Sequence, residues 1–319
     1  MPLLFKSTVD LINQKKQLYM RTISNFLFAL IVVLSVSCKK NDNEPFPAMK
    51  DGFGLVLNDS IVYNYTQIDF YDFSSHLVYL KDGNTFSYSK EGTFKVFANR
   101  SEIYSGKILS MSSTTIGDKP IIECAPSFFD DYIIAIGFYQ ITDSTGKFLN
   151  NDPRGDIRIV EALKKYHQYL NGLSCTIDTI NFTSSKNATV SLVLTNNDDL
   201  NYYYLDPQKM RTNLFHYFTN GLYTFANNTD GYNYFFNKDS VERPKTIRTW
   251  DKKWLSLLKS KESTKIIVNY ANFKPLSKGT YTMFFDFPGL SWVDKKDLQQ
   301  DNGRIWLGNL KMKKKILIK

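Results

Sequence analysis

Short apolar runs that alternate with polar residues fill most of the chain after residue 50. A period of two places successive side chains on opposite faces of an extended strand, so that one face can be buried. In residues 188–194, Val190, Leu192 and Leu194 share one face. Turn-forming residues interrupt such runs roughly every 8–12 residues, which is typical of antiparallel β-sandwiches. The pattern predicts a mainly β fold.

The predicted strands fall into two groups. The first group of strands predicts a smaller β-sandwich over residues 51–151. Its strands are expected at 61–65, 77–80, 93–98, 102–108 and 133–141. The second predicts a larger one over residues 173–312, with strands at 175–182, 188–194, 201–205, 215–225, 232–236, 265–270, 279–289 and 303–308.

A segment with helical periodicity, residues 152–172, separates the two groups. Ile159 and Leu163 recur at helical spacing, Asp156 suits the N-terminal cap, and Gly172 suits the C-terminal end. We therefore expect two antiparallel β-sandwich domains joined by a helix.

The region 238–261 interrupts the second group of strands. Trp250, Trp254 and Leu257 fall on one helical face, which predicts a short helix ending near Lys261. We expect this helix to cover one end of the larger sandwich.

Two segments of the second group resemble strands of a known fold. TVSLVLTNND, residues 189–198, and GTYTMFFDFPG, residues 279–289, look like the B and F strands of immunoglobulin-like β-sandwiches. The resemblance implies an immunoglobulin-like arrangement for residues 173–312, and it implies no function.

The most hydrophobic run of the chain is FLFALIVVLSV, residues 26–36. A membrane-spanning helix needs about 20 apolar residues, whereas the hydrophobic region of a signal peptide needs only about 7–15. Arg21 precedes the run and the small residues Ser35 and Ser37 follow its core, which is the order of a secretory signal.

The segment Ser35-Val36-Ser37-Cys38, with Leu34 just before it, resembles the signal sequence of Bacteroides-type bacterial lipoproteins. The resemblance implies that residues 1–37 are a signal peptide and that Cys38 is acylated, with membrane lipid as its partner. It also implies export and attachment to the outer membrane, on its periplasmic or cell-surface side.

The start of the signal and the segment after it complete this prediction. Met20 begins a signal of ordinary length, so we expect residues 1–19 to be a mis-assigned start. Residues 38–50 are polar and proline-containing, which predicts a flexible tether.

The net charge of +9 arises from 40 basic and 31 acidic residues. Residues 38–319 hold 36 basic and 30 acidic residues, and five of the lysines lie at 311–319. The rest of the body is close to neutral, which argues against a nucleic-acid partner. We expect residues 313–319 to form a solvated basic tail, with contact to anionic lipid as the alternative.

No catalytic constellation is evident in the sequence. His76, His167 and His216 are isolated, and no serine-hydrolase elbow, phosphate-binding loop or metal-ligand spacing occurs. The adjacent pairs Asp130-Asp131 and Asp198-Asp199 are interpreted as solvated loop acids, because neighbouring strand residues point apart. We expect no enzyme activity, cofactor or metal.

Besides Cys38, the chain contains Cys124 and Cys175. In an oxidising compartment these two can form a disulfide. The alternative is two separate buried thiols that act as small hydrophobic residues.

Aromatic residues make up 15% of the chain. Their apolar faces can stack on sugar rings, and neighbouring amides can bind hydroxyl groups. The candidate ligand-binding surface comprises Tyr202, Tyr204, Tyr217, Tyr223, Tyr232, Tyr234 and Asn220. The alternative is an ordinary set of core and edge tyrosines.

Two functional hypotheses follow from these predictions. The first is a membrane-anchored envelope lipoprotein that acts as a non-catalytic binding or accessory protein for glycans. The alternative is a structural or protein-interaction module of the outer membrane, such as an adhesin or assembly subunit with an envelope protein as partner.

Overall fold

The computed structural model describes residues 51–87, 90–110, 112–113, 118–124, 128–139, 150–225, 232–236, 241–246 and 248–318. The signal peptide, Cys38 and the tether lie outside these residues, so the statements about them stay predictions. Residues Met49–Lys319 group into one compact unit. As predicted, the described residues form a mainly β fold with several sheets, consistent with a β-sandwich.

A nine-stranded sheet occupies residues 53–170. Its strands lie in the order β2-β1-β5-β6-β7-β8-β4-β3-β9, and all neighbours are antiparallel except β6 with β7 and β3 with β9. The hairpin between β5 and β6 turns through Asn99 and Arg100, which both have positive φ as a type I′ turn requires. The bounds are β1 Phe53–Leu57, β2 Ile61–Asn64, β3 Ile68–Asp72, β4 Leu77–Leu80, β5 Gly92–Ala98, β6 Ser101–Leu109, β7 Ile121–Glu123, β8 Ile133–Gly137 and β9 Tyr169–Leu170.

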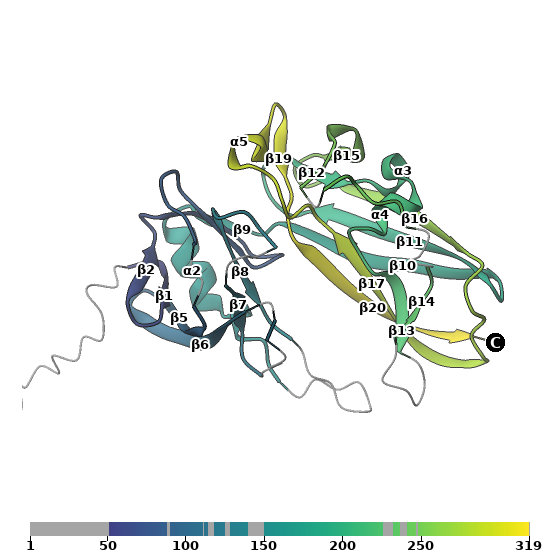
Figure 1. The fold of residues 1–319 in the computed structure, drawn as a ribbon, viewed down its shortest axis with the longest axis horizontal. Helices are drawn as coiled ribbons and strands as arrows, with labels where there is room; N and C mark the ends of the chain where they lie inside the picture. Colours follow the sequence, from purple (N-terminus) through teal and green to yellow (C-terminus); the bar gives the residue numbers. More distant parts are fainter. Residues whose placement is uncertain are drawn as a thin grey trace, which may run out of the picture. The chain divides into compact units, whose positions relative to one another are not determined.

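Helix α2, Ile157–Lys165, lies against this sheet (Figure 1). Asp156 caps the helix as predicted, because its side chain accepts a hydrogen bond from the Arg158 backbone N–H at 2.9 Å. The apolar side of the helix joins strand residues in one hydrophobic cluster, which includes Ile159, Ala162, Leu163, Leu55, Phe94 and Val96.

The helix is shorter than the sequence pattern predicted. A 3-10 turn, Pro153–Gly155, precedes α2, and the chain leaves the helix at Tyr166 and enters β9 through His167 at φ +57°. The strands of residues 53–170 form one continuous sheet with α2 packed on it, whereas two facing sheets were predicted.

Three further sheets are built from described residues after 172. Their orders are β10-β11-β16, β14-β13-β17-β20 and β15-β12-β19-β18. The bounds are β10 Leu173–Ser184, β11 Asn187–Asn196, β12 Tyr202–Leu205, β13 Gly221–Phe225, β14 Tyr232–Tyr234, β15 Leu255–Leu258, β16 Ser263–Ala271, β17 Gly279–Pro288, β18 Gln299–Gln300, β19 Gly303–Ile305 and β20 Asn309–Ile318.

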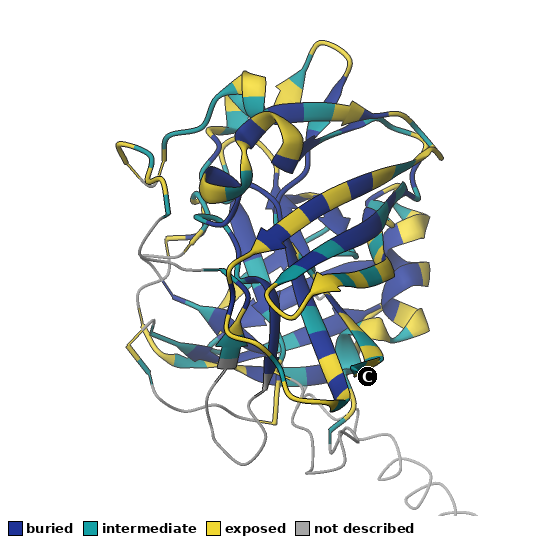
Figure 2. Ribbon diagram, turned by 90° about the vertical axis from the view of Figure 1, so that its right-hand side faces the viewer, coloured by how far each residue is buried: buried dark blue, intermediate teal, exposed yellow. Residues whose placement is uncertain are grey.

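The β10-β11-β16 sheet and the β14-β13-β17-β20 sheet are stacked with a hydrophobic core between them (Figure 1). Strands whose residues alternate between buried and exposed are visible in Figure 2. The core between the sheets includes Val190, Leu192 and Val268 from one side and Leu222, Met283 and Phe285 from the other.

Three local predictions differ from the structure. Residues 250–261 form only the 3-10 turn Lys252–Trp254 and then β15, because Leu255 and Leu258 are buried in pairing with β12. Residues 215–225 contain the end of helix α4, Thr212–Phe215, before β13 begins at Gly221. The other short helices are α3, Pro207–Met210, and α5, Lys295–Leu298.

The third difference concerns the predicted basic tail, which is a strand. Residues Asn309–Ile318 form β20 and pair along their whole length with β17. Apolar residues alternate with the lysines, so that Leu310 and Met312 contact the core while Lys311 and Lys313 are exposed. Counting the lysines alone did not reveal that the side chains of this segment alternate with a period of two.

The buried acid Asp198 stabilises the connection between β9 and β10 through hydrogen bonds. Its carboxylate accepts hydrogen bonds from the backbone N–H groups of Asn171 at 2.8 Å and Gly172 at 2.7 Å, and from the Tyr202 hydroxyl at 2.7 Å. Asp198 was interpreted as a solvated loop acid, and that interpretation is wrong. Its neighbour Asp199 is indeed exposed.

A second buried acid, Asp72, ends β3 close to the same connection. Its Oδ1 accepts hydrogen bonds from the backbone N–H and hydroxyl of Ser74, at 2.9 and 2.7 Å, and from the N–H of Ser75. Gly172 has φ +75°, and a Cβ there would lie 2.4 Å from Asp72 Oδ1, so no larger residue fits without a shift. Burial raises the pKa of Asp72 from 3.8 to about 6.

Hydrogen bonds also join the nine-stranded sheet to residues that follow β17. The Tyr132 hydroxyl donates to the Val293 carbonyl at 2.7 Å, and Lys295 donates to the Leu80 carbonyl at 2.6 Å. The division of the chain into two domains at residues 152–172 stays a prediction.

Candidate functional site

The predicted tyrosine surface separates into two groups in the structure. Tyr202 and Tyr204 lie on β12, where they are 1% and 5% exposed within the hydrophobic core. These two residues therefore act as core residues, as the alternative interpretation expected, and they do not form an exposed surface with the others.

Most of the remaining predicted residues gather around the β14-β13-β17-β20 sheet. Tyr223 on β13 pairs with Tyr234 on β14, with ring centroids 5.9 Å apart. Tyr217 and Asn220 line a pocket beside this sheet. Tyr232 belongs to β14, and its side chain lies outside the described residues.

The pocket has a volume of about 520 Å³, within the range of about 300–1,000 Å³ that is usual for small-molecule sites. Its walls come from the segment between α4 and β13, from the segment before β15, and from β17 and β20. The lining residues are His216, Tyr217, Phe218, Thr219, Asn220, Val241, Arg243, Pro244, Lys245, Thr246, Asp286 and Asn309.

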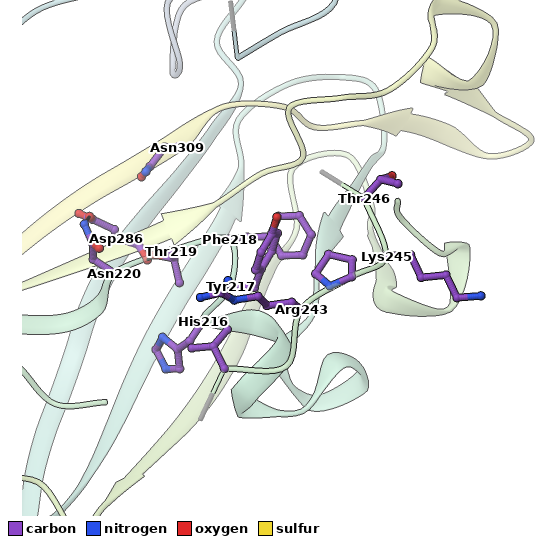
Figure 3. A pocket seen from close by; sticks show the side chains of 12 residues that line it. His216, Tyr217, Phe218, Thr219, Asn220, Arg243, Lys245, Thr246, Asp286 and Asn309 are labelled. Atoms are coloured by element: carbon purple, nitrogen blue, oxygen red, sulfur yellow. Dashed lines mark hydrogen bonds between the residues drawn. The ribbon is translucent and has the colours of Figure 1, made fainter. Parts of the chain in front are cut away.

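Asp286 forms the centre of the polar wall. It lies on β17, is 3% exposed, and accepts hydrogen bonds from Asn220 Nδ2 at 3.4 Å and from the Tyr223 hydroxyl at 3.3 Å. The Thr219 hydroxyl donates to the Asp286 backbone carbonyl. Figure 3 shows Thr219, Asn220 and Asp286 together on one side of the pocket. The carboxylate therefore holds the wall in place.

A glycine holds the segment that carries these residues close to the sheet. Gly221 begins β13 at φ +60°, and a Cβ there would lie 2.0 Å from His216 Cε1. The backbone N–H of the next residue, Leu222, donates a hydrogen bond to the Tyr270 hydroxyl at 3.1 Å. The ring of His216 is buried and stacks on Phe236, with centroids 4.4 Å apart. His216 is thus a packed core residue.

The opposite wall is cationic. Arg243 and Lys245 are exposed; Figure 3 shows Arg243 beside Tyr217 and the Lys245 side chain pointing away from Asp286. Tyr217 and Phe218 lie between the two walls in that view. Amide, hydroxyl and guanidinium groups around aromatic rings can hydrogen-bond and stack on a polar ligand.

Sequence reasoning missed Asp286, Arg243 and Asn309. For Asp286 a signal was present, because Tyr281, Met283, Phe285 and Phe287 alternate inward along β17 and leave Asp286 on the outer face. For Arg243 no periodic signal exists, since it lies in an irregular segment.

A second cavity, of about 240 Å³, lies beside Trp250, one of the two tryptophans that the sequence pattern assigned to a helix. It is lined by Asp130, Arg248, Trp250, Trp292, Asp294 and Asp297. The Arg248 guanidinium lies over the Trp292 ring, 4.6 Å from its centroid. The face of Trp292 is therefore already covered by a side chain of the protein itself.

The two cysteines among the described residues are free thiols. Cys124 is buried in the hydrophobic cluster of the nine-stranded sheet, whereas Cys175 packs against the cluster of the later sheets. The predicted disulfide is not formed in the structure. Cys124 and Cys175 are two separate thiols, as the alternative prediction stated. Burial raises the pKa of the Cys175 thiol to about 12, so this thiol is unreactive.

Within the described ranges, no three histidine, cysteine, aspartate or glutamate side chains are grouped so as to hold a metal ion. No helix of the described part is both long enough and apolar enough to span a membrane. No protein-family model matches the sequence, and searches of curated proteins and of solved structures found no match either.

Proposed function

We propose that this chain is an exported lipoprotein, anchored to the outer membrane through acylated Cys38, whose body is a non-catalytic glycan-binding or accessory protein. The ligand occupies the pocket between β17 and the segment 241–246. The observation that supports this most directly is the chemistry of the pocket, where two amides, two hydroxyls and a guanidinium surround Tyr217 and Phe218. Sugars offer many hydroxyl groups for such donors and acceptors, and an apolar ring face for the aromatics.

The proposed fold is a pair of domains joined by the α2 segment, with an immunoglobulin-like sandwich after residue 172. Two strand orders support it, β10-β11-β16 in one sheet and β14-β13-β17-β20 in the other. The segments that resemble the B and F strands are β11 and β17, and these lie in opposite sheets, as B and F do in that fold.

Removing pocket side chains should weaken glycan binding without unfolding the protein. We expect Tyr217→Ala and Asn220→Ala each to weaken the affinity about tenfold, since each removes one stacking or hydrogen-bonding contact worth about 1–1.5 kcal/mol. A glycan array identifies the ligand, and titration calorimetry on the purified protein measures the change. Tyr139→Ala and Asn302→Ala are matched controls, because both are exposed residues outside the pocket lining. If no glycan binds, the proposal fails.

The anchor is tested separately. Cys38→Ala removes the acylated side chain, so we expect the variant to leave the membrane fraction or to accumulate with its signal uncleaved. Two acyl chains hold a protein stably because each buried methylene contributes about 0.8 kcal/mol. Fractionation of cells followed by detergent partitioning measures this, with Cys124→Ala as the control. Unchanged membrane retention of Cys38→Ala contradicts the anchor.

The alternative, a protein-interaction module, is favoured by one observation. Strand β16 is an edge of its sheet, and Ile267 on it is 43% exposed. An exposed edge can pair with a strand of another protein. Cross-linking in intact cells that recovers an envelope protein through β16, together with an empty glycan array, selects this function over glycan binding.

A further inference from the structure

Three exposed lysines follow one another along the outer face of β20. Lys311, Lys313 and Lys315 are exposed, while Met312 between them is buried. In a strand, residues two apart lie on the same face, about 6.8 Å from each other. The three ammonium groups therefore form a line rather than a patch.

This line begins at the pocket. Asn309, the first residue of β20, lines the pocket and lies two residues before Lys311, on the same face of the strand. From Asn309 to Lys315 the strand rises by about 20 Å. A linear polymer with one unit in the pocket can thus continue along the lysines.

A row of aromatic rings crosses the same face of the sheet. Tyr234, Tyr223, Phe284 and Lys313 occupy paired positions on the four strands β14, β13, β17 and β20. The Tyr223 and Phe284 rings are stacked with centroids 5.4 Å apart. The Tyr223 hydroxyl reaches Asp286 of the pocket wall, so the row and the pocket share one surface.

The charge of this surface is mainly positive. Arg243 and Lys245 of the pocket add two exposed cations, and the exposed Glu242 directly precedes Arg243 in the sequence. The one acid on this face of β17, Asp286, is buried and holds the pocket wall through hydrogen bonds. Lys314 is not part of the line, because it donates to backbone carbonyls of Ile177 and Asp178.

We infer that the ligand is an acidic polysaccharide, with carboxylate or sulfate groups that bind Lys311, Lys313 and Lys315 while one sugar unit occupies the pocket. The inference rests on the proposed function and narrows its ligand class. A line of cations one strand wide that leads into a walled pocket with amides and hydroxyls suits a chain-like anion. An anionic membrane surface would need cations spread over a face, and it would leave the pocket without a role.

The test compares an oligosaccharide of galacturonic acid, a sulfated oligosaccharide and a neutral glucose oligosaccharide of equal length, by titration calorimetry on the purified protein. We expect the wild type to prefer an acidic oligosaccharide, with an affinity that falls as salt is added. The triple variant Lys311→Gln, Lys313→Gln and Lys315→Gln should weaken this binding at least about tenfold, since each exposed ion pair contributes a modest amount. The corresponding triple arginine variant keeps the charge and should retain binding.

The control removes three exposed lysines elsewhere, Lys107→Gln, Lys119→Gln and Lys186→Gln, and should leave the affinity unchanged. Unchanged melting temperatures of all three variants show that they are folded. Equal binding of neutral and acidic oligosaccharides, unaffected by the β20 variant, overturns the inference but leaves the proposed function intact. If no oligosaccharide binds, both fail. Lysine-dependent binding to anionic phospholipid vesicles without oligosaccharide binding also overturns the inference, in favour of a membrane surface.

Discussion

Replacing Asp198 with alanine is expected to lower the free energy of unfolding by about 3–5 kcal/mol. The carboxylate accepts three hydrogen bonds of 2.7–2.8 Å, and it is 8% exposed. Its removal leaves two backbone N–H groups and the Tyr202 hydroxyl buried without their acceptor. Urea denaturation followed by tryptophan fluorescence measures the change.

The adjacent residue provides the control. The Asp199 side chain is 96% exposed and makes an ion pair with Lys261 at 3.2 Å. Asp199→Ala should therefore change the free energy of unfolding by no more than about 1 kcal/mol. Equal losses in the two variants would show that Asp198 does not anchor this connection.

The second large effect depends on pH and arises from Asp72. Burial raises its pKa in the folded protein to about 6, and the negative charge of Asp198 adds to the rise, whereas the Ser74 and Ser75 donors lower it. The unfolded pKa is near 3.9. The folded state therefore binds the proton more tightly, and the resulting stability is fully present below about pH 4 and is lost as the pH rises through about 6. The loss amounts to about 3 kcal/mol.

Asp72→Asn tests this by removing the titrating group and keeping an oxygen acceptor for Ser74. The variant should be more stable than the wild type by up to about 3 kcal/mol at pH 8, and the two should converge near pH 4. Urea midpoints measured from pH 4 to pH 8 give the difference. A difference that does not change over this range would mean that the pKa of Asp72 is not raised in the folded protein.

The strands of the fold were largely predictable from alternation. Runs such as residues 188–194 and 265–270 show a clear period of two, and they form β11 and β16. Where the local spacing of apolar residues disagrees with the tertiary packing, the prediction from the sequence was wrong. Residues 250–261 have helical spacing, yet Leu255 and Leu258 gain more by pairing with β12, which is some fifty residues away in the chain.

The candidate site was only partly predictable. Tyr217 and Asn220 were identified, because aromatic and amide residues cluster in that segment. The same argument grouped them with Tyr202 and Tyr204, since composition does not reveal which sheet a tyrosine joins or whether a second layer covers it. Asp198 and Asp286 show the same limit: whether an acid is solvated or buried depends on donors that are distant in the sequence.

The pairing of β3 with β9 has a consequence for the nascent chain. Tyr71 and Tyr169 are partners roughly a hundred residues apart, so β3 receives its outer neighbour late in synthesis. Until then its backbone N–H and carbonyl groups are open to strands of other molecules, and the apolar residues that α2 later covers are uncovered. Residues 53–137 are therefore prone to aggregation until residues 157–170 have folded onto them.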